Sequence, residues 1–130
     1  MTRLEEFLIL ALTAAGVGVG YADYIQTRNN SRSVSERVSF LGVEETAREG
    51  RPLRGSDLAG LDCVELDLLR NVVFARYGRA FTKSREARDY FSAQPWYKID
   101  PHFTTDRLTD LDWRNVKAVE RAEAKMVCPK

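Results

Sequence analysis

The chain has 130 residues, of which 44% are apolar and 30% are charged. This length and composition fit one small globular domain with a terminal extension and exclude a wholly disordered chain. Twenty basic and 19 acidic residues give a formal charge of +1, so the net charge gives no reason to expect nucleic acid as a partner.

Residues 1–25 form a hydrophobic segment that predicts a membrane anchor or an export signal. The run from Phe7 to Ala22 carries no charge. As a helix it would span about 24 Å, short of the roughly 30 Å hydrocarbon core unless it continues to residue 25. Gly20 and Ala22 are small residues of the kind that a signal-peptide cleavage site needs, so cleavage near Ala22 is the alternative to a retained anchor. A buried helix of a soluble protein is the third interpretation.

Two features bear on how this segment would be used. Gly16 and Gly20 have the GxxxG spacing that lets two membrane helices approach closely, although glycine is also common in signal sequences. Basic residues are denser after the segment than before it, and they include Arg28, Arg32 and Arg37. The positive-inside rule then favours a cytoplasmic position for the rest of the chain.

Residues 26–57 are predicted to be a linker with one short helix. Residues 23–39 are polar and rich in Asn and Ser. Val34–Arg48 has a loose helical spacing of apolar residues, and glycine and proline follow it. The apolar residues are Val34, Val38, Leu41 and Val43, and the helix breakers are Gly50, Pro52 and Gly55.

Residues 58–130 are predicted to be a helical domain, whose central helix begins at Asp62. Glu65 follows three residues later, which is the spacing of a capping box. The run to Tyr77 has apolar residues at steps of three and four and contains neither Gly nor Pro, so a largely buried helix is expected. Gly78 stands where a left-handed helix cap favours glycine.

Two more helices are predicted in the C-terminal part of this domain. Ser84 is placed to cap a short helix that ends before Pro95. Thr109 and Asp112 begin a last helix, whose apolar stripe consists of Leu111, Val116, Val119, Ala122 and Met126. Residues 94–103 between them form a turn-rich aromatic loop. The fold class is therefore all-α, with three to four helices, an aromatic loop and an N-terminal hydrophobic helix, and no convincing strand.

The sequence LRNVVFARYGRAF, from Leu69 to Phe81, resembles the signature of the YARHG domain family. The resemblance continues through the aromatic loop to Asn115 and covers roughly residues 58–120. The family occurs in extracytoplasmic parts of bacterial envelope proteins and its biochemical role is poorly defined, so the resemblance implies a location and a fold more than an activity. Tyr77 stands where the family motif has its His, so any chemistry of that His is lost here, and Phe74 replaces the motif's first Tyr.

Four residues of the motif are expected to be structural: Arg70, Asn71, Arg76 and Gly78. The two guanidinium groups lie on or beside an apolar helix and need carboxylate or carbonyl partners, and Asp89 or Asp100 can supply a carboxylate. The amide of Asn71 is expected to bond loop backbone, and Gly78 to adopt a positive φ. Together they would lock the helix to the aromatic loop.

The alternative for the motif is a binding surface for an anionic or glycan ligand, formed by cations and aromatic rings. Its candidate residues are Arg76, Tyr77, Arg79, Trp96 and Tyr97. Aromatic residues beside proline are more often lids on a core, and this is the interpretation that we prefer for Trp96, Tyr97 and Phe103.

No catalytic residue, metal site or cofactor is predicted. His102 is the only histidine and stands in a loop, and no H-E-x-x-H, C-x-x-C or G-x-S-x-G motif occurs. No pair of carboxylates stands out as a catalytic pair, and five of them are interpreted as solvated or capping groups, so a cell-wall hydrolase is the weakest hypothesis. These carboxylates are Glu65, Asp67, Asp106, Asp110 and Asp112.

Cys63 and Cys128 are predicted to form a disulfide that ties the C-terminal tail to the central helix. Such a bridge requires an oxidising compartment and agrees with export. Two reduced cysteines are the alternative. We give the bridge more weight than the charge bias around the hydrophobic segment.

The sequence thus predicts a non-catalytic, membrane-tethered or exported module of the bacterial envelope that binds a protein complex or a cell-wall polymer. It would be anchored in the inner membrane through residues 7–25 with an extracytoplasmic domain, or exported after cleavage near Ala22. The alternative is a single-pass accessory subunit of a larger membrane complex, packed through Gly16 and Gly20.

Overall fold

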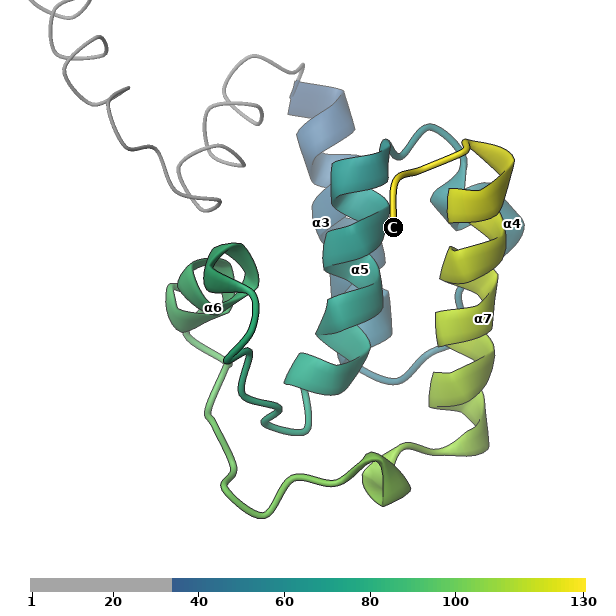
Figure 1. Cartoon of the computed structure of the whole chain (residues 1–130). Coiled ribbons are helices and arrows are strands. Elements are labelled where there is room, and N and C mark those ends of the chain that lie inside the picture. The colour runs from purple at the N-terminus through teal and green to yellow at the C-terminus, as the bar shows by residue number, and fades with distance from the viewer. Residues whose placement is uncertain (1–33) are drawn as a thin grey trace, which may run out of the picture.

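The computed structural model describes residues 34–130, with side chains described from residue 39 onward. The elements in order are α3 (Val34–Arg48), α4 (Gly55–Leu58), α5 (Cys63–Ala75), α6 (Arg85–Ser92), the 3-10 turn η1 (Thr105–Arg107) and α7 (Asp110–Lys125), as Figure 1 shows. These residues contain no strand, which confirms the helical fold class for this part of the chain.

The predictions for the N-terminal segment lie outside the described residues. They are the hydrophobic helix of residues 1–25, cleavage near Ala22, the packing of Gly16 and Gly20, and the first part of the linker. Within residues 34–130, none of the helices combines the length and the apolar composition that crossing a membrane would need.

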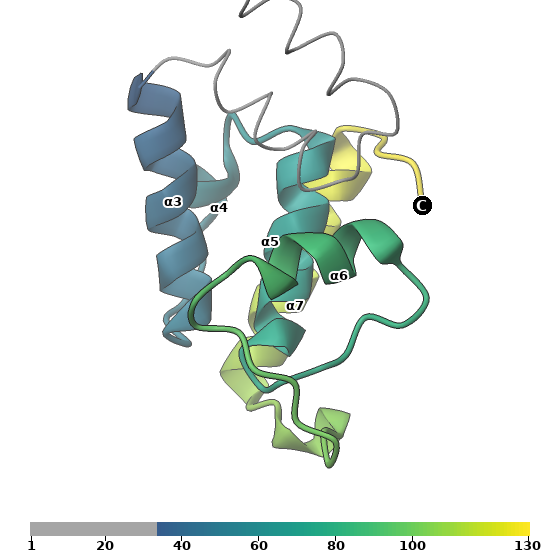
Figure 2. The same ribbon diagram turned by 90° about the vertical axis from the view of Figure 1, so that its left-hand side faces the viewer.

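Helix α5 is the centre of the fold and contacts α3, α6 and α7. Helix α7 runs antiparallel to α5, and α3 lies on a different side of α5 (Figure 1). The view in Figure 2 shows α6 crossing α5 at a steep angle, with the long loop that follows α6 continuing to the start of α7. The short helix α4 packs against α7.

The central position of α5 follows from its sequence. Asp62 accepts a hydrogen bond from the Glu65 N–H at 3.0 Å, and Glu65 accepts one from the Asp62 N–H at 3.1 Å, so the predicted capping box is confirmed. Apolar side chains then cover several faces of the helix and are almost fully buried, namely Leu66, Leu68, Leu69, Val72 and Val73. A helix that is apolar on several faces needs neighbours on several sides.

The packed core begins earlier in the chain than the domain boundary predicted at residue 58. Helix α3 has the predicted bounds, and its Phe40, Val43 and Ala47 belong to the same core as α5. Leu41, which was assigned to the apolar stripe, is 57% exposed, because the face of α3 that meets α5 contains residues 40, 43 and 47. Helix α4 was not predicted, since Gly55 was interpreted as a breaker.

The aromatic loop closes the core next to α6, as predicted. Ser84 caps α6 by accepting a hydrogen bond from the Ala87 N–H at 3.2 Å. Phe91 of α6 is fully buried and stacks on Phe81, with 4.8 Å between ring centroids. The rings of Trp96 and Tyr97 lie 6.0 and 5.7 Å from that of Phe91, so both residues act as lids on the core.

Candidate functional site

The motif begins where α5 ends and the chain turns toward the aromatic loop. Gly78 has a φ of +89°, as predicted, and its carbonyl accepts a hydrogen bond from the Asp100 N–H at 2.8 Å. A Cβ at this position would stand 2.7 Å from the Asp100 backbone nitrogen and 2.8 Å from the Lys98 carbonyl oxygen. Glycine is therefore required both by the backbone angle and by the close approach of the loop.

Asp112 joins the motif to the first turn of α7. Its carboxylate is fully buried and accepts a hydrogen bond from Arg76 Nη1 at 2.9 Å and one from the Tyr77 hydroxyl at 2.5 Å. It also accepts one from the Thr109 N–H at 2.9 Å, which completes the predicted capping box of α7. Partial burial, and then the hydrogen bond to Asp112, raise the pKa of the Tyr77 phenol.

The partners predicted for Arg76 and Arg70, Asp89 and Asp100, were wrong. Asp100 instead pairs with Arg107 and accepts a hydrogen bond from the His102 N–H, and the Arg107 bond is the main cause that lowers the pKa of Asp100. Asp89 lies 3.8 Å from the side-chain nitrogens of two arginines of its own helix, Arg85 and Arg88. Nothing in the local sequence marks Asp112 as the partner, because it follows Arg76 by 36 residues.

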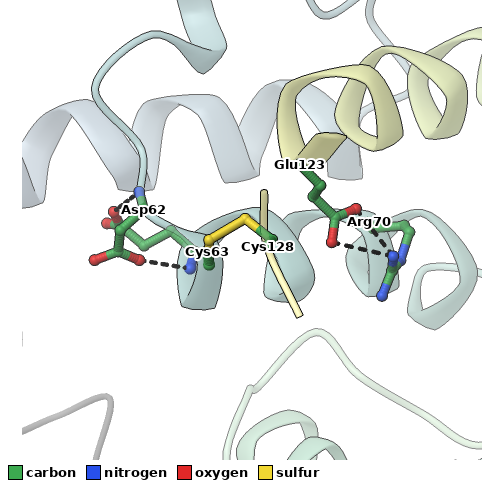
Figure 3. Close-up of a disulfide and its surroundings, with 6 residues drawn as sticks. Asp62, Cys63, Arg70, Glu123 and Cys128 are labelled. Carbon is green, nitrogen blue, oxygen red and sulfur yellow. Dashed lines mark hydrogen bonds and ion pairs between the residues drawn. A yellow bond between two sulfur atoms is a disulfide. The ribbon is translucent and has the colours of Figure 1, made fainter. Parts of the chain in front are cut away.

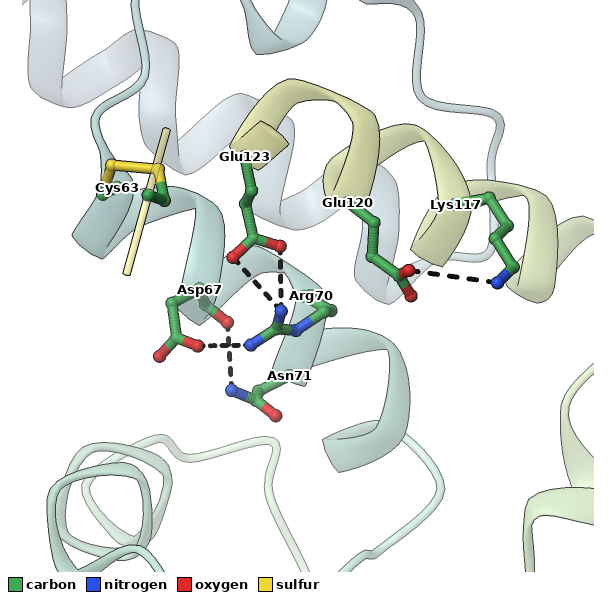
Figure 4. A network of polar contacts seen from close by, with 8 residues as sticks. Cys63, Asp67, Arg70, Asn71, Lys117, Glu120 and Glu123 are labelled. Atoms are coloured by element: carbon green, nitrogen blue, oxygen red, sulfur yellow. Dashed lines mark hydrogen bonds and ion pairs between the residues drawn. A yellow bond between two sulfur atoms is a disulfide. The ribbon is translucent and has the colours of Figure 1, made fainter. Parts of the chain in front are cut away.

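Arg70 lies on the part of α5 that faces the second half of α7. Figure 4 shows its guanidinium between two carboxylates, that of Glu123 at 2.9 Å and that of Asp67 at 2.6 Å. Burial raises the pKa of Glu123, and the positive charge of Arg70 opposes that rise. Arg70 thus connects α5 to α7, and not to the aromatic loop as predicted.

Asn115 has the role that was predicted for Asn71. The Asn71 amide donates to the Asp67 carbonyl of its own helix at 3.0 Å. Asn115, which is 2% exposed, accepts a hydrogen bond from the Leu53 N–H and donates one to the Arg51 carbonyl, both at 2.9 Å. It therefore provides hydrogen-bond partners for the backbone of the loop between α3 and α4, which lies outside any helix or strand.

Asp112 and Asn115 are the two site residues that sequence reasoning did not single out as structural. Asp112 was interpreted as a solvated or capping carboxylate, yet both residues are buried on the face of α7 that carries Val116 and Val119. Each stands four residues before one of these valines. Polar residues at core positions of an amphipathic helix are the signal that would have found them, because such groups need buried partners.

The residues predicted to bind a ligand are only partly brought together. Arg76, Tyr77 and Trp96 line one shallow hollow with Lys98. The Arg79 guanidinium does not line it and lies over the Phe74 ring, at 5.0 Å from the centroid.

Tyr97 does not line the hollow either, and both it and Trp96 have partners within the domain. The Tyr97 hydroxyl donates to the Arg79 carbonyl at 2.5 Å, and the Arg48 guanidinium lies over the Trp96 ring at 5.5 Å from the centroid. Residues 34–130 contain no cluster of three or more metal-ligating side chains. Binding at this hollow stays a prediction.

The predicted disulfide between Cys63 and Cys128 is confirmed, with the two Cα atoms 5.5 Å apart. It connects the first turn of α5 to the tail that follows α7. Figure 3 shows the bridge near the pair of Arg70 and Glu123, so a covalent link at the start of α5 and an ionic link near its middle both tie α5 to the C-terminal part of the chain around α7. The tail turns back at Val127, whose φ is +54°.

A comparison with protein families agrees with the resemblance stated above. The family model of the YARHG domain matches residues 46–124, which is more than half of the chain. No match was found among curated proteins or among solved structures. The matched range contains the motif at the end of α5, the aromatic loop, and Asp112 and Asn115 on α7.

Proposed function

The chain belongs to the YARHG domain family of extracytoplasmic bacterial domains, and we propose that it is a non-catalytic binding or assembly module of the cell envelope. The disulfide between Cys63 and Cys128 carries this proposal. Disulfides of this kind form and persist in oxidising compartments such as the periplasm, whereas cytosolic thiols are kept reduced. This outweighs the basic residues after the hydrophobic segment, which favour a cytoplasmic position.

Residues 7–25 tether the module to the inner membrane in this proposal, with the helical domain outside the cytoplasm. Release after cleavage near Ala22 is the second form of the same function. The ligand is an envelope protein complex or a cell-wall polymer. A single-pass subunit of a larger membrane complex is the alternative, and the GxxxG spacing of Gly16 and Gly20 favours it.

The contacts of the motif support binding over catalysis. The carboxylate of Asp112 is fully buried and accepts hydrogen bonds from three donors. Arg70 is held between two carboxylates. Groups engaged in this way hold helices together, whereas a general acid, a base or a nucleophile must reach a substrate.

Location is tested by the intact mass of the full-length protein made in a bacterium and recovered, unreduced and denatured, with and without thiol alkylation. Two cysteines that resist alkylation until a reductant is added are expected, on a chain of full mass or one beginning near residue 23. A full-mass chain with both thiols alkylated would refute the extracytoplasmic location. A chain that begins near residue 23 would remove the subunit alternative.

Binding is tested on the same preparation by two assays. A wall-binding module would sediment with isolated peptidoglycan, and a complex subunit would co-purify with its partners in stoichiometric amount from detergent extracts. Loss of a measured hydrolytic activity on changing a single carboxylate would contradict the non-catalytic proposal.

A further inference from the structure

Two adjoining hollows form a groove along the outer face of α7. The first has a volume of about 370 Å³ and lies between α4 and the second half of α7. Its apolar lining comes from Leu53, Leu58 and Leu61, whose side chains are largely buried, and from the small side chains of Ala118 and Ala122. The alanines leave open the space that larger side chains on α7 would fill.

The second hollow continues this groove toward the start of α7. It shares Leu53, Ala118 and Arg121 with the first hollow and extends to Trp113. Trp113 is 39% exposed, and Met126 in the first hollow is 49% exposed. The groove is therefore apolar along its length, with an exposed large side chain near each end.

The charged residues that line the groove are all basic. Arg114, Arg121 and Lys125 are spaced by seven and four residues, which places them on one face of the helix. None of the three has an ion-pair partner among the residues that the structure describes, and Lys117 has only an exposed contact at 3.9 Å to Glu120. The carboxylate of Glu123, by contrast, points to Arg70 on α5 (Figure 4).

We propose that this groove docks a short amphipathic segment of a partner protein, with apolar side chains in the hollows and carboxylates on Arg114, Arg121 and Lys125. The inference rests on the proposed function as a binding module and names the chemical class of its partner. Segments that place an apolar stripe in a groove are a recurring mode of peptide recognition. Complementary charges at the rim then select the partner and its orientation.

The shape of the groove favours a protein segment over a lipid surface. Leu53, Leu58 and Leu61 are recessed and 4–8% exposed, so only side chains that project from a partner can reach them. Binding to a membrane surface instead needs apolar side chains that protrude into the lipid.

The probe for the test is a synthetic peptide with leucines on one helical face and glutamates beside them. Its binding to the full-length protein in neutral-detergent micelles is measured by fluorescence anisotropy, with empty micelles as the blank. Two control peptides replace either all glutamates by lysine or all leucines by alanine. Saturable binding of the acidic peptide is expected, with each control peptide at least about tenfold weaker.

Groove variants locate the binding. Ala118→Leu fills the space between the hollows, and the pair Arg121→Glu and Lys125→Glu reverses the charge of the rim. Each is expected to weaken binding of the acidic peptide about tenfold or more. The charge-reversed protein should bind the lysine peptide more tightly than the parent protein does. Lys83→Glu, at an exposed position away from the groove, is the matched control and should change affinity by less than about twofold.

Equal binding of the acidic and lysine peptides, or unchanged affinity in the groove variants, would overturn the proposal. So would binding to phosphatidylglycerol vesicles that needs Arg121 and Lys125 when no peptide binds, because the surface would then recognise a membrane. Dimerisation of the protein that Ala118→Leu abolishes would place a second copy in the groove. If the cysteines are freely alkylated but the peptide still binds, the extracytoplasmic location is refuted and the docking proposal is not.

Discussion

Arg76 at the end of α5 and Asp112 in the first turn of α7 form an ion pair at 2.9 Å, in which the carboxylate is fully buried. The disulfide holds the other end of the same antiparallel helix pair, and the pair of Arg70 and Glu123 joins the two helices between these points. Helices α5 and α7, which make the most extensive contact of the fold, are thus fixed at both ends of their interface.

Asp112→Asn is expected to destabilise the domain by about 2–3 kcal/mol. The amide keeps the shape of the side chain but removes the charge that holds the Arg76 guanidinium, and loss of one partner of a largely buried pair is costly. Urea unfolding of the full-length protein measures the change. Asp110→Asn, at an exposed position in the same turn, should destabilise the domain by less than about 1 kcal/mol. Equal destabilisation by the two variants would show that Asp112 contributes only through its negative charge at the helix N-terminus.

Asn115→Ala is expected to lower the free energy of unfolding by about 2–3 kcal/mol. The change leaves the buried Leu53 N–H without its acceptor and the Arg51 carbonyl without its donor. Asn71→Ala removes a single bond within one helix and should cost about 1 kcal/mol or less. Hydrogen exchange at Leu53 gives a second measurement, and unchanged protection there in Asn115→Ala would contradict the assigned role.

Local features of the fold could be predicted from the sequence because their causes lie within a few residues. The caps at Asp62, Ser84 and Thr109 each depend on a side chain and a backbone N–H three residues later. The positive φ of Gly78 follows from its place after a helix without other breaks. The disulfide was predicted because the placement of the two cysteines, at the start of the central helix and in the tail, agrees with export to an oxidising compartment.

The features that could not be predicted depend on which elements meet in space. Asp89 and Asp100 were the partners predicted for Arg76, and only the antiparallel packing of α5 and α7 brings Asp112 to it instead. The groove was not predicted for a related reason. Ala122 fits an apolar stripe equally well whether it faces a core or leaves a hollow open, and the short helix α4 decides between the two.

Gly78→Ala and Gly42→Ala are expected to change stability in opposite directions. Alanine at residue 78 meets the Asp100 backbone at 2.7 Å with a φ of +89°, so a loss of at least about 2 kcal/mol is expected. Gly42 lies within α3, and a Cβ there has no neighbour within 4 Å. The gain in helix propensity should stabilise the domain by about 0.5–1 kcal/mol. Thermal unfolding of the two variants measures these changes. A shift of the midpoint in the same direction for both would contradict the assigned roles of the two glycines.

Glu44→Gln is expected to stabilise the domain at neutral pH. Burial raises the pKa of the Glu44 carboxyl above its ordinary value of 4.5, although the Tyr90 hydroxyl and Arg48 oppose this rise. The folded state then binds the proton more tightly than the unfolded chain. The free energy of unfolding therefore falls as pH rises from 4.5 through the raised pKa.

The glutamine variant lacks this pH-dependent loss of stability. Its advantage over the parent protein should be largest near pH 7 and should shrink toward pH 4, as urea unfolding across that range would measure. Glu45→Gln, at an exposed position of the same helix, is the matched control. A constant difference between Glu44→Gln and the parent at all pH values would mean that the carboxyl does not titrate in this window.

The double variant Cys63→Ser and Cys128→Ser is expected to lose about 4 kcal/mol of stability, because the bridge closes a loop with a sequence separation of 65. The free energy of unfolding of a native domain is only about 5–15 kcal/mol. Without the bridge the protein would therefore be only marginally stable in a compartment that keeps thiols reduced. Urea unfolding with and without a reductant measures this. The reductant should lower the midpoint of the parent protein to that of the double variant and leave the variant unchanged. A parent midpoint that is insensitive to complete reduction would mean that the noncovalent contacts between α5 and α7, the pair of Arg70 and Glu123 among them, hold the helices together without the bridge.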